Sequence, residues 1–245
     1  MDRQGYFDHA IFFIVVITLY TIGVMQTTFL PTPWEIGYAL EEQFEQGLLI
    51  PALEAAVYAI AVGYFIAVIV GIPVGVAMGI DRHVNSFLNP YVNAIYVVPF
   101  SALVPALVIW FGTGYQVRVL VVFFFAVFPI VMNSQEGART APENLIEAAR
   151  SFGADRLYII RNIVLPHEIS YVVAGLRLGI GRAVKGLVIT ELLISATGFG
   201  LLLHRYSARL EFAGVFSVVL LLMTMGIVSV WTLKQIESRI VHWEA

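Results

Sequence analysis

The sequence predicts an all-α protein that crosses a lipid bilayer about six times. Of its 245 residues, 59% are apolar and only 13% are charged, whereas a soluble domain usually has about a quarter charged residues. The mean hydropathy is +0.85. Six segments are apolar over roughly the 20 residues that a helix needs to cross about 30 Å of hydrocarbon. They are residues 10–29, 55–80, 90–111, 117–132, 169–196 and 213–233.

The first two segments differ in what they carry. Segment 10–29 is expected to remain as a span, because its apolar run is longer than the core of a signal peptide and no small-x-small cleavage site follows it. In segment 55–80, Gly71, Gly75 and Gly79 recur every four residues. This spacing predicts a stripe of small residues on one helix face, where another backbone can approach closely. The stripe suits static packing of two helices; the alternative is a surface that slides during gating.

The third and fourth segments contain prolines that interrupt helical hydrogen bonding, namely Pro99, Pro105 and Pro129. Interrupted helices are tolerated inside membranes where protein or a water-filled cavity satisfies the freed backbone groups. Phe100 and Ser101 lie between the first two prolines and are therefore candidates for lining a solute pathway. The alternative is a simple kink that is buried against neighbouring helices.

The basic residues predict the orientation, since cytoplasmic segments carry an excess of Lys and Arg. With six spans and a cytoplasmic N-terminus, eight basic residues fall inside and three fall outside. The inside set is Arg3, Arg82, Arg139, Arg150, Arg156, Arg161, Lys234 and Arg239, and the outside set is Arg118, Arg205 and Arg209. The outer segment 30–50 has four glutamates and no Lys or Arg. Both termini are therefore expected in the cytoplasm.

The longest inside segment, residues 133–168, contains signals for a short helix. Thr140 is expected to cap its start, with Glu143 three residues later completing a capping box. Pro142 then lies in the first turn, where its missing N–H is harmless. Gly153 suits a left-handed residue at the end of this helix.

A second short helix is expected directly after the first. Asp155 can cap its start, and the helix is expected over residues 156–164. Leu165 and Pro166 are expected to stop it before the fifth span. The sequence thus predicts two short cytoplasmic helices, whose exposed faces mix charged residues with small alanines.

A motif runs through these two helices. Glu147-Ala148-Ala149 is followed after three residues by Gly153, after nine more by Ile163, and then by Leu165-Pro166. This pattern resembles the EAA motif of the permease subunits of ABC importers, and all seven defining positions match with the spacing of that family. The resemblance extends from about residue 50 to the C-terminus and is closest to the nitrate/sulfonate/taurine-type branch. The further matching positions are Asn89-Pro90, Pro99, Pro105, Trp110-Phe111-Gly112, Phe128-Pro129, Gly175-Leu176-Arg177, Gly181-Arg182-Ala183, Glu191 and Gly198-Phe199-Gly200.

The resemblance implies a type I ABC importer permease fold, with residues 1–245 as one transmembrane domain and a coupling loop over about 133–168. It implies a second permease subunit in a homodimer, two cytoplasmic ATP-binding subunits, an extracytoplasmic substrate-binding protein, and a prokaryotic inner membrane. The residues that it assigns to ATPase coupling are Glu147, Ala148, Ala149, Arg150, Gly153, Leu165 and Pro166. The alternative is that they only cap and turn the loop.

Several kinds of chemistry lack the residues that they need. The chain has no cysteine, and its five histidines show no metal-binding spacing. Neither lysine, Lys185 or Lys234, follows the glycine-rich turn of a P-loop. We therefore expect no catalytic or metal site and no cofactor in this chain, with ATP and magnesium bound by the partner ATPase subunits. No basic cluster suits nucleic acid.

Four charged residues fall in or near the fifth span: Arg177, Arg182, Lys185 and Glu191. Charges within hydrocarbon are costly and usually face a protein interior or a water-filled cavity. They are candidates for a cationic pathway that eases the passage of an anion. Alternatively, Arg177 reaches the membrane surface, while Lys185 and Glu191 are internally paired.

The predicted function is the membrane subunit of an ATP-driven importer that works by alternating access, for a small organic or inorganic anion of the nitrate, sulfonate or taurine kind. Within the same class, the solute could instead be a heterocyclic vitamin precursor. An ATP-independent secondary transporter would show inverted repeats and paired broken helices, and a membrane enzyme would gather His, Asp or Glu at one site. The sequence shows neither pattern.

Overall fold

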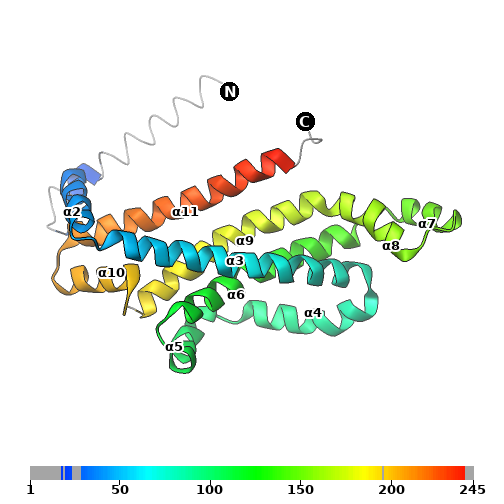
Figure 1. The fold of residues 1–245 in the computed structure, drawn as a ribbon, viewed down its shortest axis with the longest axis horizontal. Helices are drawn as coiled ribbons and strands as arrows, with labels where there is room; N and C mark the ends of the chain where they lie inside the picture. The colour runs from blue at the N-terminus through cyan, green and yellow to red at the C-terminus, as the bar shows by residue number, and fades with distance from the viewer. Residues whose placement is uncertain (1–17, 19, 24–28, 195, 241–245) are drawn as a thin grey trace, which may run out of the picture.

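The protein is an elongated bundle of helices, seen here in a computed structural model that describes residues 18, 20–23, 29–194 and 196–240 (Figure 1). All regular elements in these ranges are helical, as the sequence predicts. The elements are α2 (Pro33–Glu45), α3 (Leu49–Ile80), α4 (Arg82–Val97), α5 (Phe100–Phe111), α6 (Tyr115–Arg139), α7 (Glu143–Ser151), α8 (Arg156–Ile159), the π-helical turn η1 (Ile160–Val164), α9 (Leu165–Ile194), α10 (Gly198–Ala208) and α11 (Phe212–Ile240).

Three single helices in the described ranges are long and apolar enough to cross a membrane, and two bent pairs raise this to as many as five spans. The single helices are α3, α6 and most of α11, which confirms the second, fourth and sixth predicted segments. The bent pairs are α4 with α5, and the run from α8 through α9 with α10. The first predicted segment, 10–29, lies mostly outside the described residues.

The third predicted segment, 90–111, falls within the bent pair of α4 and α5 and is broken next to Pro99, one of the prolines expected to interrupt it. The chain turns by 92° between α4 and α5, and Val98 leaves the helical region with φ −62° and ψ 128°. The cause is Pro99, whose ring disfavours helical geometry in the residue before it. The elbow directs α5 away from the bundle axis, as Figure 1 shows.

The core lies where α3 packs against α6 and α6 packs against α9. The small-residue stripe of α3 faces α6, as expected from the sequence. A Cβ atom added at Gly79 would lie 2.5 Å from the Cβ of Ala138, and one added at Gly75 would overlap the carbonyl oxygen of Val131. The two backbones thus meet so closely that no larger residue fits, which fixes the rotation of α3 relative to α6.

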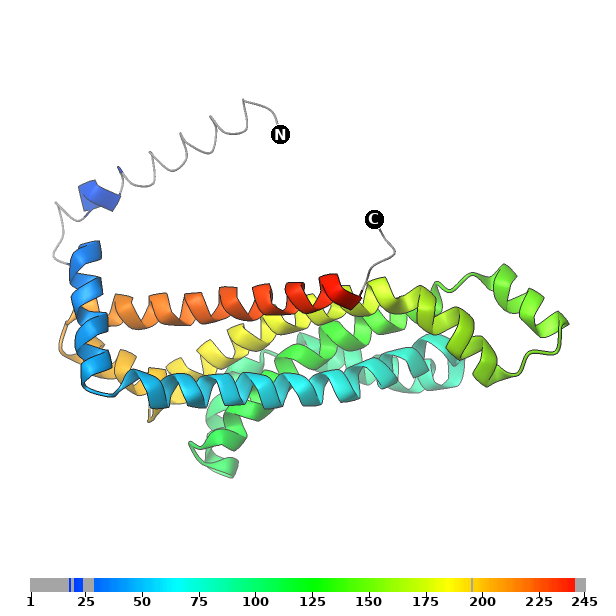
Figure 2. The same cartoon turned by 45° about the horizontal axis from the view of Figure 1, so that its top comes forward.

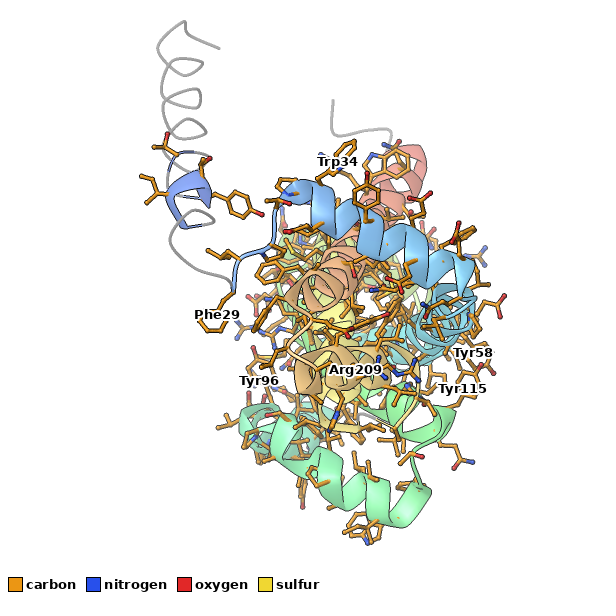
Figure 3. The ribbon with its side chains drawn as sticks, turned by 90° about the vertical axis from the view of Figure 1, so that its left-hand side faces the viewer. Phe29, Trp34, Tyr58, Tyr96, Tyr115 and Arg209 are labelled. Carbon is orange, nitrogen blue, oxygen red and sulfur yellow. The ribbon has the colours of Figure 1, made fainter. Side chains whose placement is uncertain are left out.

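One end of the bundle is crossed by α2, which lies at a steep angle to α3 and α11 (Figure 2). Thr32 caps α2 through a capping box, in which Thr32 and Glu35 each accept a hydrogen bond from the other's backbone N–H. The buried Gln43 amide donates to Ser217 Oγ at 2.7 Å and thereby ties α2 to α11. Figure 3 looks onto this end, where the rings of Tyr58 and Tyr115 lie 4.9 Å apart.

Candidate functional site

The short helix α7 forms the tip of the opposite end of the bundle (Figures 1 and 2). It begins at Glu143 with Pro142 at its N-cap, so the expected cap at Thr140 and its capping box are wrong. The Thr140 hydroxyl instead donates to the carbonyl oxygens of Glu136 at 2.8 Å and Gly137 at 3.3 Å. The hydroxyl thus bonds to carbonyl groups in the last turn of α6. This helix runs about two turns beyond the predicted span.

The end of α7 is the left-handed turn that the sequence predicts. Gly153 has φ +80°, a conformation that costs a residue with a Cβ atom about 1–2 kcal/mol. The Ala154 N–H donates to the Ala149 carbonyl at 3.0 Å, and the Gly153 N–H donates to Arg150 at 2.9 Å. This pair of bonds is a Schellman motif. It reverses the chain so that the next helix leads directly back to the bundle.

Asp155 caps the next helix as expected, accepting from the Tyr158 N–H at 2.8 Å. The predicted stop at Leu165 and Pro166 is wrong, because α8, η1 and α9 form one helical run. The π-helical turn η1 explains how the helix continues past Pro166. Leu165 donates to the Ile160 carbonyl, one residue farther back than in an α-helix. A widened turn of this kind relieves the clash of a proline ring with the preceding turn.

The residues of the EAA pattern divide into an outward face and an inward face. Glu147, Ala148 and Arg150 are exposed. Ala149 is half-buried and packs, together with Ile146, against a small core cluster of buried residues from α6, α8 and their connections. The inward face holds α7 on the bundle, and the outward face is exposed. Gly153, Leu165 and Pro166 are also exposed.

Two large apolar side chains next to the motif were missed by the sequence argument. Phe152 is 92% exposed and Leu157 is 70% exposed. Both stand beside motif positions and not at them, so the pattern gave no reason to select them. Exposed apolar groups gathered at one projecting tip are typical of a surface that binds another protein.

An ion pair braces the base of this tip. Arg156 Nη2 lies 2.9 Å from Asp81 Oδ2 and joins α8 to the corner between α3 and α4. The Arg156 hydrogen bond, followed by those from the backbone N–H groups of His83 and Val84, lowers the pKa of Asp81 below its ordinary value. The carboxylate is therefore charged at neutral pH, and the brace is intact there.

A second candidate site is a cavity of about 280 Å³ beside the elbow between α4 and α5. Three of the residues expected to line a solute pathway meet there: Phe100, Ser101 and Arg182. The remaining lining residues are Tyr96, Val98, Pro99, Phe124, Phe125, Phe128 and Ile189. Arg182 Nη2 donates to the Tyr96 hydroxyl at 2.6 Å, a partner that the sequence argument missed because it lies 86 residues away.

The other three expected pathway residues lie outside this cavity. Arg177 is exposed, farther toward the α7 end of α9. Lys185 is also exposed and lines an apolar groove between α9 and α11, together with Lys234. Glu191 is 1% exposed and is paired internally, as the alternative interpretation had it, with Arg118 as its partner. The four charges of the fifth span therefore do not converge on one site.

The Arg118–Glu191 pair is buried at the end of the bundle that carries α10. Arg118 Nε lies 2.6 Å from Glu191 Oε1, and its Nη2 donates to the Thr197 hydroxyl at 2.8 Å. The other carboxylate oxygen of Glu191 accepts from the Gly200 N–H in the first turn of α10 at 2.9 Å. Such a fully bonded ion pair joins α6, α9 and α10. Within the described ranges, no three His, Asp or Glu side chains gather as a metal site.

Comparison with known proteins places these features in a family. The family model described as "Binding-protein-dependent transport system inner membrane component" matches residues 67–242. The taurine transport system permease protein of Escherichia coli is 28% identical over 231 residues, covering 92% of this chain and 84% of that protein. The formylaminopyrimidine transport permease protein of Halalkalibacterium halodurans is 25% identical, covering 96% and 95%.

A solved structure shares the fold. One chain of an inward-facing methionine ABC transporter aligns with a TM-score of 0.65 at 18% sequence identity. The alignment covers 80% of this chain and 98% of that chain. At this level of identity the likeness concerns the arrangement of helices alone.

Proposed function

Because the chain belongs to the family of binding-protein-dependent transport system inner membrane components, it is a permease of an ABC importer, and we propose that α7 couples it to ATP hydrolysis by separate subunits. The observation that carries the proposal is the exposed tip of α7, joined through Gly153 to one helical run that reaches the middle of the bundle. This chain then provides the solute pathway and the coupling contact, and the ATPase subunits bind ATP and magnesium.

The geometry of the tip supports docking into a groove. Ala148 is small and exposed, so another protein surface can come close to the helix there, while the exposed charges of Glu147 and Arg150 fix the register. The apolar side chains of Phe152 and Leu157 are exposed next to these charged residues and would be covered in such a complex. All seven residues assigned to coupling by the family motif lie on this tip or on the run directly behind it.

The connection behind the tip supports transmission of movement. The Schellman turn joins α7 to α8, and α8 continues through η1 into α9 without a break. A helix is stiff along its axis, so a displacement of α7 by an ATPase subunit moves α9 as a lever. Since Arg182 lies on that lever, opening and closing of the ATPase pair would alternate the exposure of the central cavity to the two sides of the membrane.

The same proposal sets the orientation and the partners. The α7 end lies in the cytoplasm with both chain termini, and the α2 and α10 end faces outward, toward a substrate-binding protein. Burial of Arg118 in an ion pair removes one of the three basic residues from the outside count and strengthens the charge asymmetry. A second copy of this chain is proposed to complete the pathway, as the family resemblance implies.

The solute is proposed to be a small anion. The E. coli relative is named for taurine, which carries a sulfonate, and the cavity beside the elbow has Arg182 as its charged residue. We place the pathway past Phe100, Ser101 and Arg182, which meet in that cavity. The alternative solute is a heterocyclic vitamin precursor, favoured by the relative named for formylaminopyrimidine.

The coupling proposal is tested with the complete transporter reconstituted in liposomes, measuring ATP hydrolysis and solute uptake together. Glu147→Lys reverses a charge at the tip, and Gly153→Val places a branched residue at φ +80°. We expect both variants to insert normally but to lose most uptake and most solute-stimulated ATP hydrolysis. Gly153→Asn is the matched control, because Asn tolerates the left-handed region, and it should retain uptake. Wild-type uptake by Glu147→Lys and Gly153→Val would remove the coupling role of α7.

A further inference from the structure

The cavity beside the α4–α5 elbow lies about half a membrane thickness from the α10 end of the bundle. At 1.5 Å rise per residue, Arg182 is about 18 Å from the end of α9 at Ile194, and Phe124 is about 14 Å from the start of α6 at Tyr115. Both distances are close to half of the roughly 30 Å hydrocarbon thickness. A solute crossing by alternating access must pass this depth, so a cavity here is well placed to hold it in transit.

The charge in this cavity is incompletely satisfied. A guanidinium has five N–H donors in a planar fork. Among the described residues, Arg182 uses one on the Tyr96 hydroxyl at 2.6 Å and lies 4.9 Å from the centroid of the same ring. No carboxylate of the described ranges pairs with it, and the cavity lining contains no acidic residue. A cation held at this depth without a counter-ion is suited to receive an anion.

The walls opposite this charge are aromatic. The Phe100 ring stacks on Phe124 with centroids 4.8 Å apart and an interplanar angle of 16°. Phe128 lies 6.1 Å from Phe100 at 28° and continues the same surface. Because stacking covers the facing sides of these rings, the group presents its outer ring faces and its edges, against which a flat ligand packs by offset stacking or edge-to-face contact. A bare inorganic anion would leave this face without a partner.

The size of the cavity limits what fits. Its volume of about 280 Å³ equals about nine times the ~30 Å³ that one water molecule occupies in the liquid. This space accepts a solute of about ten non-hydrogen atoms.

We propose that this cavity binds the solute in transit, and that the solute is a small organic anion with a flat apolar body, such as an aryl sulfonate or aryl carboxylate. Arg182 takes the anionic group, Tyr96 holds the guanidinium in place, and Phe100, Phe124 and Phe128 receive the body. The inference rests on the proposed transport function and narrows it, since it selects organic anions over nitrate.

The absence of cysteine in the whole chain allows a direct test. Ser101→Cys gives each copy of this chain a single thiol, in the cavity, and labelling is measured on this subunit of the otherwise native transporter complex. The measured quantity is the labelling rate with the anionic sulfonatoethyl methanethiosulfonate divided by the rate with the cationic trimethylammonium reagent. We expect this ratio to be on the order of tenfold higher at Ser101→Cys than at Gly37→Cys on α2. Adding Arg182→Gln should abolish this preference. Lys185→Gln is the matched control, because Lys185 lies on the same helix outside the cavity, and it should leave the preference intact.

Protection from labelling tests the class of solute. Millimolar benzenesulfonate should slow the labelling of Ser101→Cys at least several-fold, and the same concentration of nitrate should not. Phe124→Ala removes half of the stacked pair and should abolish the protection while leaving the charge preference unchanged. Equal protection by nitrate would overturn the organic class. A thiol that does not react, or a preference that survives Arg182→Gln, would overturn the site itself.

These outcomes are separable from failure of the proposed function. Coupling is measured by ATP hydrolysis and uptake with the α7 variants, and the cavity is measured by thiol chemistry that needs no ATP. A transporter that couples normally but shows no charge preference at Ser101→Cys would refute the cavity assignment alone.

Discussion

The buried pair of Arg118 and Glu191 gives the sharpest prediction about stability. Their side chains are 4% and 1% exposed, and the Nε–Oε1 distance is 2.6 Å. Removing one partner of a buried pair leaves an uncompensated charge and costs about 3–5 kcal/mol. Arg118 would keep its bonds to Thr197 and to the Thr113 carbonyl. The loss for Glu191→Met therefore belongs at the lower end of this range, about 3 kcal/mol.

The double variant separates the pair from its parts. Replacing both partners with apolar residues of similar volume is often close to neutral, although here Gly200 would lose the acceptor for its N–H, at about 1–3 kcal/mol. We expect the double variant, Arg118→Met with Glu191→Met, to lose less stability than the sum of the losses in the two single variants. The difference should be about 2 kcal/mol or more. The singles should each lower the midpoint of unfolding by about 6–12 °C.

The assay is thermal unfolding of the purified permease in detergent, followed by tryptophan fluorescence, with pulse proteolysis as a second measure. Glu191→Gln adds a useful intermediate, because its amide oxygen can still accept from Gly200 while the charge is lost. If the stability losses of the two single variants simply add up in the double variant, Arg118 and Glu191 do not stabilise each other and the prediction is refuted. A Glu191→Met variant whose stability lies within about 1 kcal/mol of wild type would refute the assignment of this pair as a structural lock.

Three further results are expected from other parts of the molecule. Gly75→Ala should destabilise the permease by about 1–3 kcal/mol in the same unfolding assay, because its Cβ would overlap Val131, whereas Gly37→Ala, with open space around it, should not. Because folding lowers the pKa of Asp81, the ionised carboxylate stabilises the folded protein. This contribution is fully present above the ordinary pKa of about 3.9 and is lost as the pH falls below that value. The stability difference between wild type and Asp81→Asn should therefore be constant above about pH 5 and shrink toward pH 3. Phe152→Ser should leave unfolding unchanged but weaken copurification of the ATPase subunits, since the side chain is 92% exposed; undiminished copurification would contradict its place in the interface.

The sequence by itself determined the features that depend on local chemistry. The apolar runs of α3, α6 and α11 follow from hydropathy, because a bilayer admits only long helices with satisfied backbones. The left-handed turn at Gly153 and the cap at Asp155 follow from the conformations and bonds that those residue types favour. The EAA pattern indicated the family for a related reason, since its positions lie in one short stretch of the chain, from Glu147 to Pro166.

The tertiary structure decided what depends on the rotation of one helix against another. Hydropathy could not show the 92° elbow at Pro99, and it could not show that the π-helical turn carries Pro166 within a continuous run. The partners of Arg182 and Glu191 lie on other helices, far along the chain. Close packing of α3, α6 and α9 sets the direction in which each charge points. For that reason only the folded chain separates the cation that lines the cavity beside the elbow from the carboxylate that locks the α10 end of the bundle.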